Sequence, residues 1–395
     1  MTKINYSRLI TALLALLLCF CATSIPALAQ GGKYIFYIGT YTNDGGKATG
    51  SKGIYAYRYD AATGKTTAIG LVAETTNPSW VALSPDGRFL YAANEVHDYK
   101  GPNSGGLSAF SVDKATGKLT FLNEVATRGA DPCYVTVDRN GKYVLVANYT
   151  GGSVAAFPIL ADGKLGDATA FVQHTGHGAD PERQEAPHAH SIELTPDNRF
   201  AIVNDLGLDE LLVYKFDSSK GTLTPNDPPF ATVAPGSGPR HFALLPSGKF
   251  AYVISEMKGT VSVFSTDLSK GTLAPVQTIS TLAKDYSGPI EDAEIRVHPS
   301  GKFVYASNRG DGNSIAVYSV DPDKGTLTLV EITSTKGKTP RHFEIDPTGK
   351  LLFAENEASD NIVVFHIDQK TGHLTPTGNV LNVAQPVCVK FLKVE

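Results

Sequence analysis

Charged residues are scarce in this chain, and no run of basic residues occurs among them. Only 19% of the 395 residues are Asp, Glu, Lys or Arg, and the formal net charge is -4. Nucleic acids and anionic membranes attract proteins through clustered positive charge, so we expect neither as a partner. Gly (38) and Pro (23) are plentiful instead, which is typical of many short strands joined by turns.

The apolar stretch from Leu9 to Ala22 has the features of a signal peptide. Lys3 and Arg8 precede it, and Ala27-Leu28-Ala29 supplies the small residues that a signal peptidase reads. We therefore predict cleavage after Ala29, a mature domain at 30–395, and a periplasmic or secreted protein without membrane contact. A membrane anchor is the alternative, although the stretch is short for a bilayer span.

Two turn motifs each occur seven times along the chain, at a period of about 50 residues. The first precedes an apolar, β-rich run, and the second usually reads Gly-(Lys/Thr)-Leu. The first motif begins at Gly32, Gly87, Gly141, Asn198, Gly248, Gly301 and Gly349. The second begins at Gly64, Gly117, Gly163, Gly221, Gly271, Gly325 and Gly372. Several short strands in each repeated unit indicate an all-β fold, a seven-bladed β-propeller.

The first and last units are each incomplete. The chain begins at a second strand, 34–38, with no innermost strand before it, and ends with a lone first strand, 386–391. If the C-terminal strand completes the N-terminal blade, the ring closes and no strand edge faces water. An open solenoid is the alternative, but it usually needs atypical capping units.

Cysteine is rare, with four in the chain. Cys19 and Cys21 lie in the predicted leader. Cys133 and Cys388 fall in predicted innermost strands of blades two apart, beyond the roughly 4.4–6.8 Å Cα separation of a disulfide. We expect two buried free thiols.

The strand pattern places a candidate site at one mouth of the central channel. The first strand of each unit runs away from this mouth and the second returns to it, so the start of one and the end of the other lie together. Strand starts contribute Ser79, Cys133, His190, Arg240, Ala293, Arg341 and Val387. Strand ends contribute Thr40, Glu95, Tyr149, Leu206, Glu256, Arg309 and Glu357. One funnel thus gathers a histidine, three arginines and three acids, and convergent charge in a concave site favours function.

Structural interpretations of these residues stay open. Arg240 and Arg341 both lie in Pro-Arg-His-Phe and could belong to the repeat itself, with Glu95 and Glu357 as their salt partners. His190 could form a hydrogen bond to a neighbouring blade. A separate cluster, His174, His177, His188 and His190, has imidazoles that suit zinc, but its spacing matches no defined zinc motif, and we assign no metal.

The chain resembles the seven-bladed β-propeller lactonase family, which includes bacterial 6-phosphogluconolactonase and a carboxy-cis,cis-muconate cyclase. The motifs that carry the resemblance are Arg183-Gln184, Pro187-His188-Ala189-His190-Ser191, Gly236-Ser237-Gly238-Pro239-Arg240-His241, Ser255-Glu256, Ala306-Ser307-Asn308-Arg309 and Thr339-Pro340-Arg341. The resemblance implies an active site at the residues corresponding to His190, Arg240, Glu256 and Arg309, the set that the strand pattern also brings together.

Lactone hydrolysis suits these residues. Glu256 or His190 would act as general base, and Arg240 and Arg309 would hold the oxyanion and an acidic group of the substrate. Arg341, His188 and Glu357 are assigned to substrate binding, and no cofactor is required. The expected partner is a small lactone or sugar acid. A muconate-type cycloisomerase and a non-catalytic binding propeller remain the alternatives.

Overall fold

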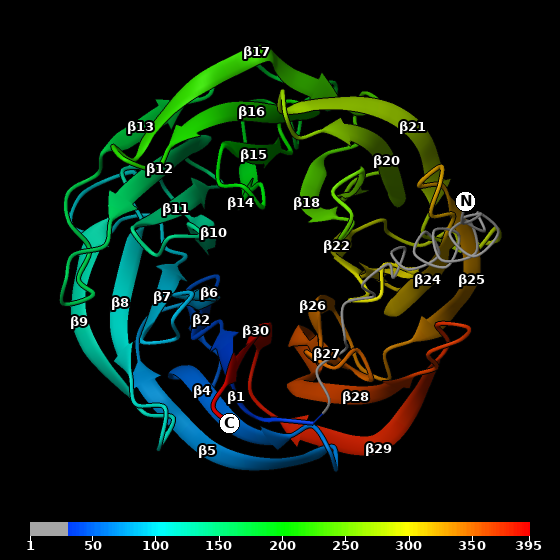
Figure 1. The fold of residues 1–395 in the computed structure, drawn as a ribbon, viewed down its shortest axis with the longest axis horizontal. Helices are drawn as coiled ribbons and strands as arrows, with labels where there is room; N and C mark the ends of the chain where they lie inside the picture. Colours follow the sequence, from blue (N-terminus) through cyan, green and yellow to red (C-terminus); the bar gives the residue numbers. More distant parts are fainter. Residues whose placement is uncertain (1–30) are drawn as a thin grey trace, which may run out of the picture.

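The computed structural model describes residues 31–395, which form seven four-stranded antiparallel sheets arranged in a ring (Figure 1). The predicted leader, residues 1–29, and its cleavage after Ala29 lie outside the described residues. Each sheet is one blade, with its first strand nearest the axis of the ring. The predicted seven-bladed β-propeller is confirmed.

The strands of each blade follow, from the axis outwards. Blade 1 consists of β30 (Pro386–Lys393), β1 (Lys33–Thr40), β4 (Gly53–Asp60) and β5 (Lys65–Glu74). Blade 2 consists of β6 (Pro78–Leu83), β7 (Phe89–Asn94), β8 (Gly106–Val112) and β9 (Leu119–Ala126). Blade 3 consists of β10 (Pro132–Val137), β11 (Tyr143–Asn148), β12 (Ser153–Pro158) and β13 (Ala170–Gln173). Blade 4 consists of β14 (Ala189–Leu194), β15 (Phe200–Asp205), β16 (Glu210–Asp217) and β17 (Thr222–Thr232).

The remaining blades have the same order. Blade 5 consists of β18 (Pro239–Leu244), β19 (Phe250–Ser255), β20 (Thr260–Asp267) and β21 (Thr272–Ser280). Blade 6 consists of β22 (Asp292–Val297), β23 (Phe303–Asn308), β24 (Ser314–Val320) and β25 (Leu327–Ser334). Blade 7 consists of β26 (Pro340–Ile345), β27 (Leu351–Asn356), β28 (Asn361–Ile367) and β29 (Leu374–Asn382). Two short strands, β2 (Asn43–Asp44) and β3 (Lys47–Ala48), and a 3₁₀ turn, η1 (Glu357–Ser359), lie in connections.

The C-terminal strand closes the ring, as predicted. β30 pairs with β1 from Tyr34 opposite Lys393 to Thr40 opposite Pro386. Phe36 of β1 lies 5.3 Å from Phe391 and 5.4 Å from Phe353 of blade 7, measured between ring centroids. A buried phenylalanine of this kind contributes about 1.5–3 kcal/mol, so the closure is stabilised by packing as well as by backbone pairing.

In six of the seven repeats the first turn contains a residue in the left-handed conformation. Gly141 has φ 66° in blade 3, and Asn198 takes the same place in blade 4 with φ 64°. Asparagine tolerates this conformation, and Asn198 Nδ2 also donates a 2.9 Å hydrogen bond to Asp138 Oδ2 in the neighbouring blade. This explains why one repeat keeps the turn without glycine.

A β-bulge lies near the start of the innermost strands. In β14, Ala189 pairs with Asp205 and Ser191 pairs with Asn204, which leaves His190 as an extra, unpaired residue. The same extra residue occurs at Ser79, Cys133, Arg240 and Arg341. A bulge reorients the side chain of its extra residue, so these positions differ from the ordinary alternation along a strand.

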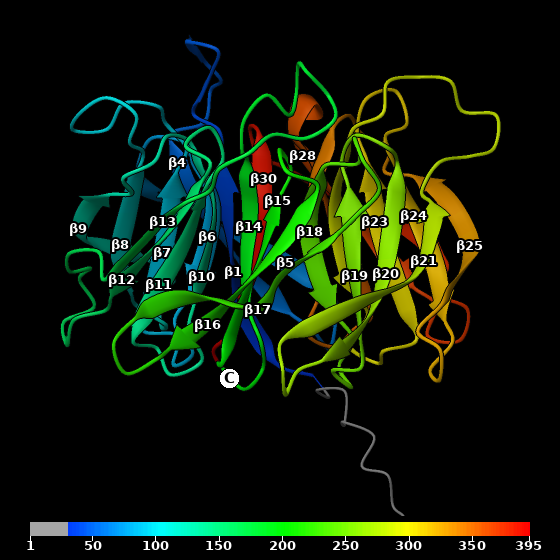
Figure 2. The same cartoon turned by 90° about the horizontal axis from the view of Figure 1, so that it is seen from above.

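The long connections project from the face where the innermost strands begin (Figure 2). They include residues 41–52, 95–105, 174–188 and 281–291. The opposite face carries the short turns. Among residues 31–395, the helical structure offers no segment of the length and hydropathy that a membrane span requires. Cys133 and Cys388 are buried and free, as expected.

Candidate active site

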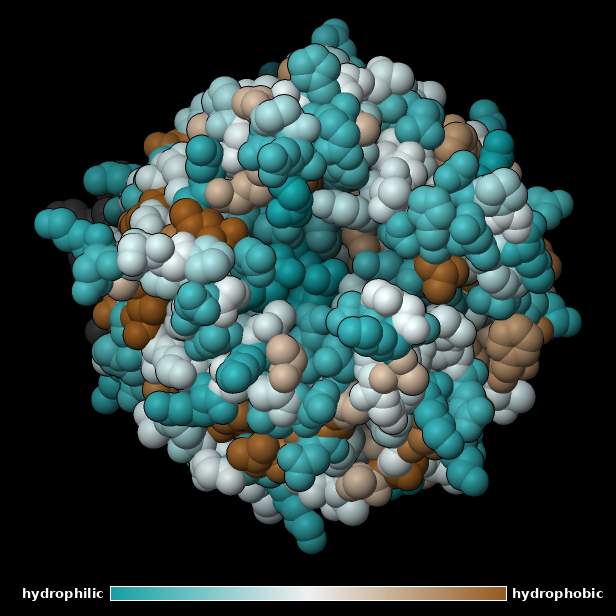
Figure 3. Space-filling model, turned by 180° about the vertical axis from the view of Figure 1, so that it is seen from behind, coloured by the Kyte–Doolittle hydropathy of each residue, from teal (hydrophilic) through white to brown (hydrophobic). Residues whose placement is uncertain are grey.

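A cavity of about 290 Å³ opens at the predicted mouth of the channel, and we call it the mouth cavity. Figure 3 shows this face, where hydrophilic residues gather around a central hollow. The lining residues are Glu95, Cys133, Tyr149, Arg183, His190, Glu256, Glu291, Arg309 and Arg341. They come from strand starts, strand ends and two long connections, so the site is assembled from segments that are far apart in the sequence.

The structure brings most of the predicted site residues together. His190, Glu256, Arg309 and Arg341 line the mouth cavity. Arg240 lies behind Glu256, with only 2% of its surface exposed. His188 and Glu357 do not line the cavity. His188 stacks on Tyr149 at 4.7 Å between ring centroids, and Glu357 begins the turn η1.

Glu256 is the centre of the charged cluster. Its Oε1 accepts a hydrogen bond from Arg183 Nη2 at 2.7 Å. Its Oε2 accepts one from Arg240 Nε at 2.9 Å and forms an ion pair with Arg309 Nη2 at 3.0 Å. Three guanidinium groups thus converge on one buried carboxylate, and each contact is charge-assisted.

These arginines control the ionisation of Glu256. Burial alone would raise the pKa of its carboxyl group, but Arg309 and Arg240 outweigh it and hold that pKa far below its usual range. Arg240 is itself affected, because burial and the nearby Arg309 lower its pKa to about 10. At neutral pH both Glu256 and Arg240 are therefore ionised. Glu256 is therefore an anchor for the arginines and a poor acceptor of protons.

His190 is the better proton acceptor. Burial, with Arg240 and His241 nearby, lowers the pKa of its imidazole well below the usual value, so the ring is neutral at pH 7. Its Nδ1 lies 3.7 Å from Cys133 Sγ. Within residues 31–395, no hydrogen bond reaches its Nε2. A neutral imidazole with one free nitrogen at the cavity wall can take a proton from water.

Arg183 is the functional residue that the strand pattern did not place. It lies in the connection 174–188, which follows no repeat, and only its motif with Gln184 pointed to it. Gln184 is fully buried and fixes this connection: its Oε1 accepts from the backbone N–H groups of Ala179 and Asp180, each at 3.0 Å. Arg183 Nη2 also lies 3.3 Å from the Tyr149 hydroxyl. Glu95, Cys133, Tyr149 and Glu291 complete the wall. The strand pattern places the first three at this mouth, with Glu95 as a salt partner, but it does not place Glu291.

Glu95 is the salt partner of Arg341. Arg341 Nη2 lies 3.9 Å from Glu95 Oε1, and the Tyr41 hydroxyl donates a 2.8 Å hydrogen bond to Glu95 Oε2. Burial raises the pKa of Glu95, and Arg341 opposes that rise. Arg341 is therefore the least tightly paired arginine of the mouth cavity.

A second buried layer closes the channel beneath His190. Trp80, His241 and His342, each the third residue of an innermost strand, meet across the channel. The ring of Trp80 lies 5.1 Å from that of His241 and 5.1 Å from that of His342, measured between centroids. Glu294 Oε2 lies 3.1 Å from His241 Nδ1 and 3.4 Å from His342 Nε2. None of these four residues lines the mouth cavity, so this layer lies deeper in the channel, one residue further along the innermost strands.

The histidine cluster of the sequence separates in space. His174 Nδ1 lies 2.6 Å from Asp205 Oδ2 inside blade 4, whereas His177 Nδ1 contacts the carbonyl of Gly178. His188 Nδ1 contacts the carbonyl of Tyr149 at 3.1 Å. In the part of the chain that the structure describes, no group of three metal-ligating side chains is close enough to hold an ion.

Known proteins are similar to this chain in sequence and in fold. The family model described as "Lactonase, 7-bladed beta-propeller" matches residues 35–391. A 6-phosphogluconolactonase of Bacillus subtilis is 39% identical over 360 residues, which cover 91% of this chain and 99% of that protein. A 6-phosphogluconolactonase of Formosa agariphila is 32% identical over 340 residues, covering 86% and 94%. Among solved structures, the periplasmic gluconolactonase of Pseudomonas aeruginosa superposes with a TM-score of 0.84 at 32% identity, covering 92% and 100%.

Proposed function

Because this chain belongs to the family of seven-bladed β-propeller lactonases, we propose that its mouth cavity hydrolyses the lactone of a sugar acid, of the gluconolactone type. The chain is a hydrolase acting on carboxylic esters of the lactone class. The observation that carries the assignment is a neutral imidazole, His190, in one cavity with guanidinium groups that Glu256 holds in place. His190 can thus accept a proton, and the guanidinium groups can donate hydrogen bonds to an oxyanion.

His190 and water begin the reaction. Nε2 of His190 takes a proton from water as the water oxygen forms a bond to the lactone carbonyl carbon. The carbonyl oxygen becomes an oxyanion, and the guanidinium of Arg309 faces it from the cavity wall. The bond from that carbon to the ring oxygen then breaks, and the proton on His190 passes to the departing ring oxygen. The open-chain sugar acid is the product.

Arg240 acts through Glu256. Its Nε is bonded to Glu256, and its Nη1 donates a 2.6 Å hydrogen bond to the backbone carbonyl of Ala293. With these donors engaged inside the protein and 2% of its surface exposed, it fits a positioning residue better than a direct contact of the oxyanion. Arg309 and Arg183 lie on the cavity side of the charged cluster.

The charge balance of the cavity favours an uncharged lactone over a phosphorylated one. Three arginines line it, Arg183, Arg309 and Arg341, against three carboxylates, Glu95, Glu256 and Glu291. Arg183 and Arg309 share Glu256, and Arg341 lies nearest Glu95. A phosphate dianion would have to compete with these carboxylates, whereas sugar hydroxyls bond to both kinds of group.

A pH-stat assay with a panel of lactones tests the function. Gluconolactone, 6-phosphogluconolactone and cis,cis-muconate are compared with spontaneous hydrolysis subtracted, using the wild type and His190→Gln. We expect acid release from gluconolactone to exceed that from its 6-phosphate at equal concentration. The His190→Gln variant should lose this acid release. If the protein opens none of the lactones faster than background, the proposed function is wrong. Faster opening of the 6-phosphate would overturn the substrate preference alone.

We further propose that the chain is exported and that its mature N-terminus is Gln30. The charged start, the apolar stretch and Ala27-Leu28-Ala29 support this. Export also fits an unphosphorylated substrate, since 6-phosphogluconolactone forms in the cytoplasm. N-terminal sequencing of protein from the periplasm or medium checks it, and an intact Met1 on cytosolic protein would contradict it.

A further inference from the structure

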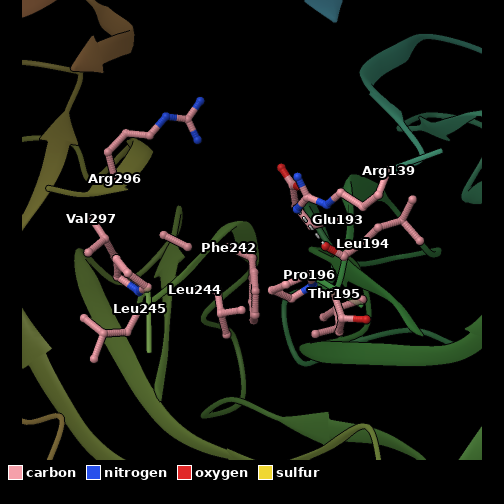
Figure 4. A pocket seen from close by; sticks show the side chains of 13 residues that line it. Arg139, Glu193, Leu194, Thr195, Pro196, Phe242, Leu244, Leu245, Arg296 and Val297 are labelled. Carbon is pink, nitrogen blue, oxygen red and sulfur yellow. Dashed lines mark hydrogen bonds between the residues drawn. The ribbon is translucent and has the colours of Figure 1, made fainter. Parts of the chain in front are cut away.

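A second cavity, of about 320 Å³, lies at the other ends of the innermost strands of blades 4, 5 and 6, and we call it the far cavity. Arg139 and Glu193 lie on one side of it, Arg296 and Val297 on the other, with Phe242 and Leu244 between them (Figure 4). The buried layer around Trp80 and His241 separates it from the mouth cavity. It is therefore not a second entrance to the active site.

The small residue Ala243 leaves space for the far cavity. The fifth residue of the innermost strand is large and charged in four blades, Glu193, Arg296, Glu344 and Lys390, and smaller in the other three, Ala82, Thr136 and Ala243. Lys390 Nζ donates a 3.1 Å hydrogen bond to Glu344 Oε2, so these side chains fill their part of the channel. Blade 5 has Ala243 between Glu193 and Arg296. The missing side-chain volume leaves space over Phe242 and Leu244.

Arg139 also departs from the repeat. Two residues after the innermost strand, five other blades have a proline: Pro85, Pro196, Pro246, Pro299 and Pro347. Blade 3 has Arg139 there, and its side chain reaches the far cavity. The backbone N–H of Arg139 donates a 3.0 Å hydrogen bond to Asn198 Oδ1, which a proline could not make, but this bond does not depend on the arginine side chain.

The Arg139 guanidinium lacks a counter-ion. Its Nη2 donates a 3.3 Å hydrogen bond to the carbonyl of Leu194, and no carboxylate of residues 31–395 lies within 4.0 Å of it. Arg296 differs, because it has Glu294 at 3.2 Å and Glu344 at 3.5 Å. The far cavity thus combines apolar walls with the exposed guanidinium of Arg139, which has no carboxylate partner among residues 31–395.

We propose that the far cavity is a second ligand site, which binds a small amphipathic carboxylate. The carboxylate pairs with Arg139, whose planar fork matches two carboxylate oxygens, and the apolar part of the ligand lies against Phe242, Leu244 and Val297. A monoanion fits better than a phosphate dianion, because Glu193 stands in the same wall. The polyhydroxylated product of the mouth cavity has no apolar part to place here.

Calorimetric titration with 4-phenylbutyrate, and with 4-phenylbutanol as its uncharged match, tests the proposal on the wild type. We expect saturable 1:1 binding of the acid, binding of the alcohol weaker by about tenfold or more, and no displacement of the acid by gluconate. Absence of saturable binding, equal binding of the alcohol, or displacement by gluconate would each overturn the proposal.

Two variants locate the site. Arg139→Met keeps the length of the side chain and removes its charge, and Ala243→Leu fills the space. Both should weaken 4-phenylbutyrate binding about tenfold or more while lactone turnover stays at the wild-type level, because neither residue touches the mouth cavity. A folded Arg139→Met protein that binds the acid as tightly as the wild type contradicts the assignment.

Discussion

Nε of Arg240 donates a 2.9 Å hydrogen bond to Oε2 of Glu256, and this contact joins the first strand of blade 5 to the end of its second strand. Arg240 is the extra residue of a bulge, and Glu256 directly follows β19. Both groups are buried, at 2% and 6% exposed. Because Arg183 and Arg309 use the same carboxylate, Glu256 sets the position of both guanidinium groups on the cavity side of the cluster.

Replacing Glu256 with Gln should disturb the donors more than the proton transfer. The amide keeps the size but removes the charge that balances three arginines, so thermal stability should fall, and kcat/KM for gluconolactone should fall by about tenfold or more. The uncompensated positive charge should also raise the relative rate on 6-phosphogluconolactone. Steady-state kinetics on both lactones measure this.

Glu344→Gln is the matched control, since it removes a paired carboxylate from the other end of the channel. It should leave the ratio of the two lactones unchanged. If Glu256→Gln also leaves that ratio unchanged, the carboxylate does not set the charge preference of the cavity.

His190→Gln should remove the base and leave binding in place. We expect kcat to fall by about 10²–10⁴-fold with KM nearly constant, because the imidazole acts in proton transfer and not in holding the ground state. Thermal unfolding should stay close to that of the wild type, which separates a chemical loss from a folding defect. A variant with wild-type kcat would exclude His190 as the base.

The strand pattern alone predicted much of this site, because repeat geometry is local. Turn glycines mark strand ends, and the ends of paired strands meet, so the pattern predicts that His190, Glu256, Arg309 and Arg341 lie at one mouth of the channel. The pattern could not show that the Arg240 guanidinium turns inwards to Glu256, since that depends on side-chain packing between blades.

Residues outside the repeat were harder to place. Arg183 reaches the cavity from a connection that Gln184 anchors through bonds to Leu206 and Asp209, and no periodicity reports such contacts. His188 and Glu357 were assigned to substrate binding from motif and register. In the structure they lie beside the cavity, because His188 stacks on Tyr149 and Glu357 belongs to a turn.

The pH profile should distinguish a buried imidazole from an exposed one. Burial and the cations beside His190 lower its pKa, so kcat/KM should be flat from about pH 6 to about pH 8 and fall only below the ordinary histidine range, as the ring becomes protonated. Glu256 opposes this lowering, so Glu256→Gln should move the acid limb to still lower pH. Initial rates with background subtraction measure both profiles. An acid limb centred at or above about pH 6.5 contradicts the assignment.

Removing the C-terminal strand should prevent folding. Deletion of residues 386–395 strips β1 of its innermost partner and exposes Phe36, which is fully buried against Phe391 and Phe353. An unpaired apolar strand edge promotes aggregation, so we expect loss of soluble, cooperatively unfolding protein. Lys33→Ala is the control, because it breaks only the exposed ion pair with Glu395, and such pairs contribute about 0–1 kcal/mol. Circular dichroism during heating compares the two. A soluble truncated protein that unfolds at the wild-type temperature would show that the ring does not depend on this closure.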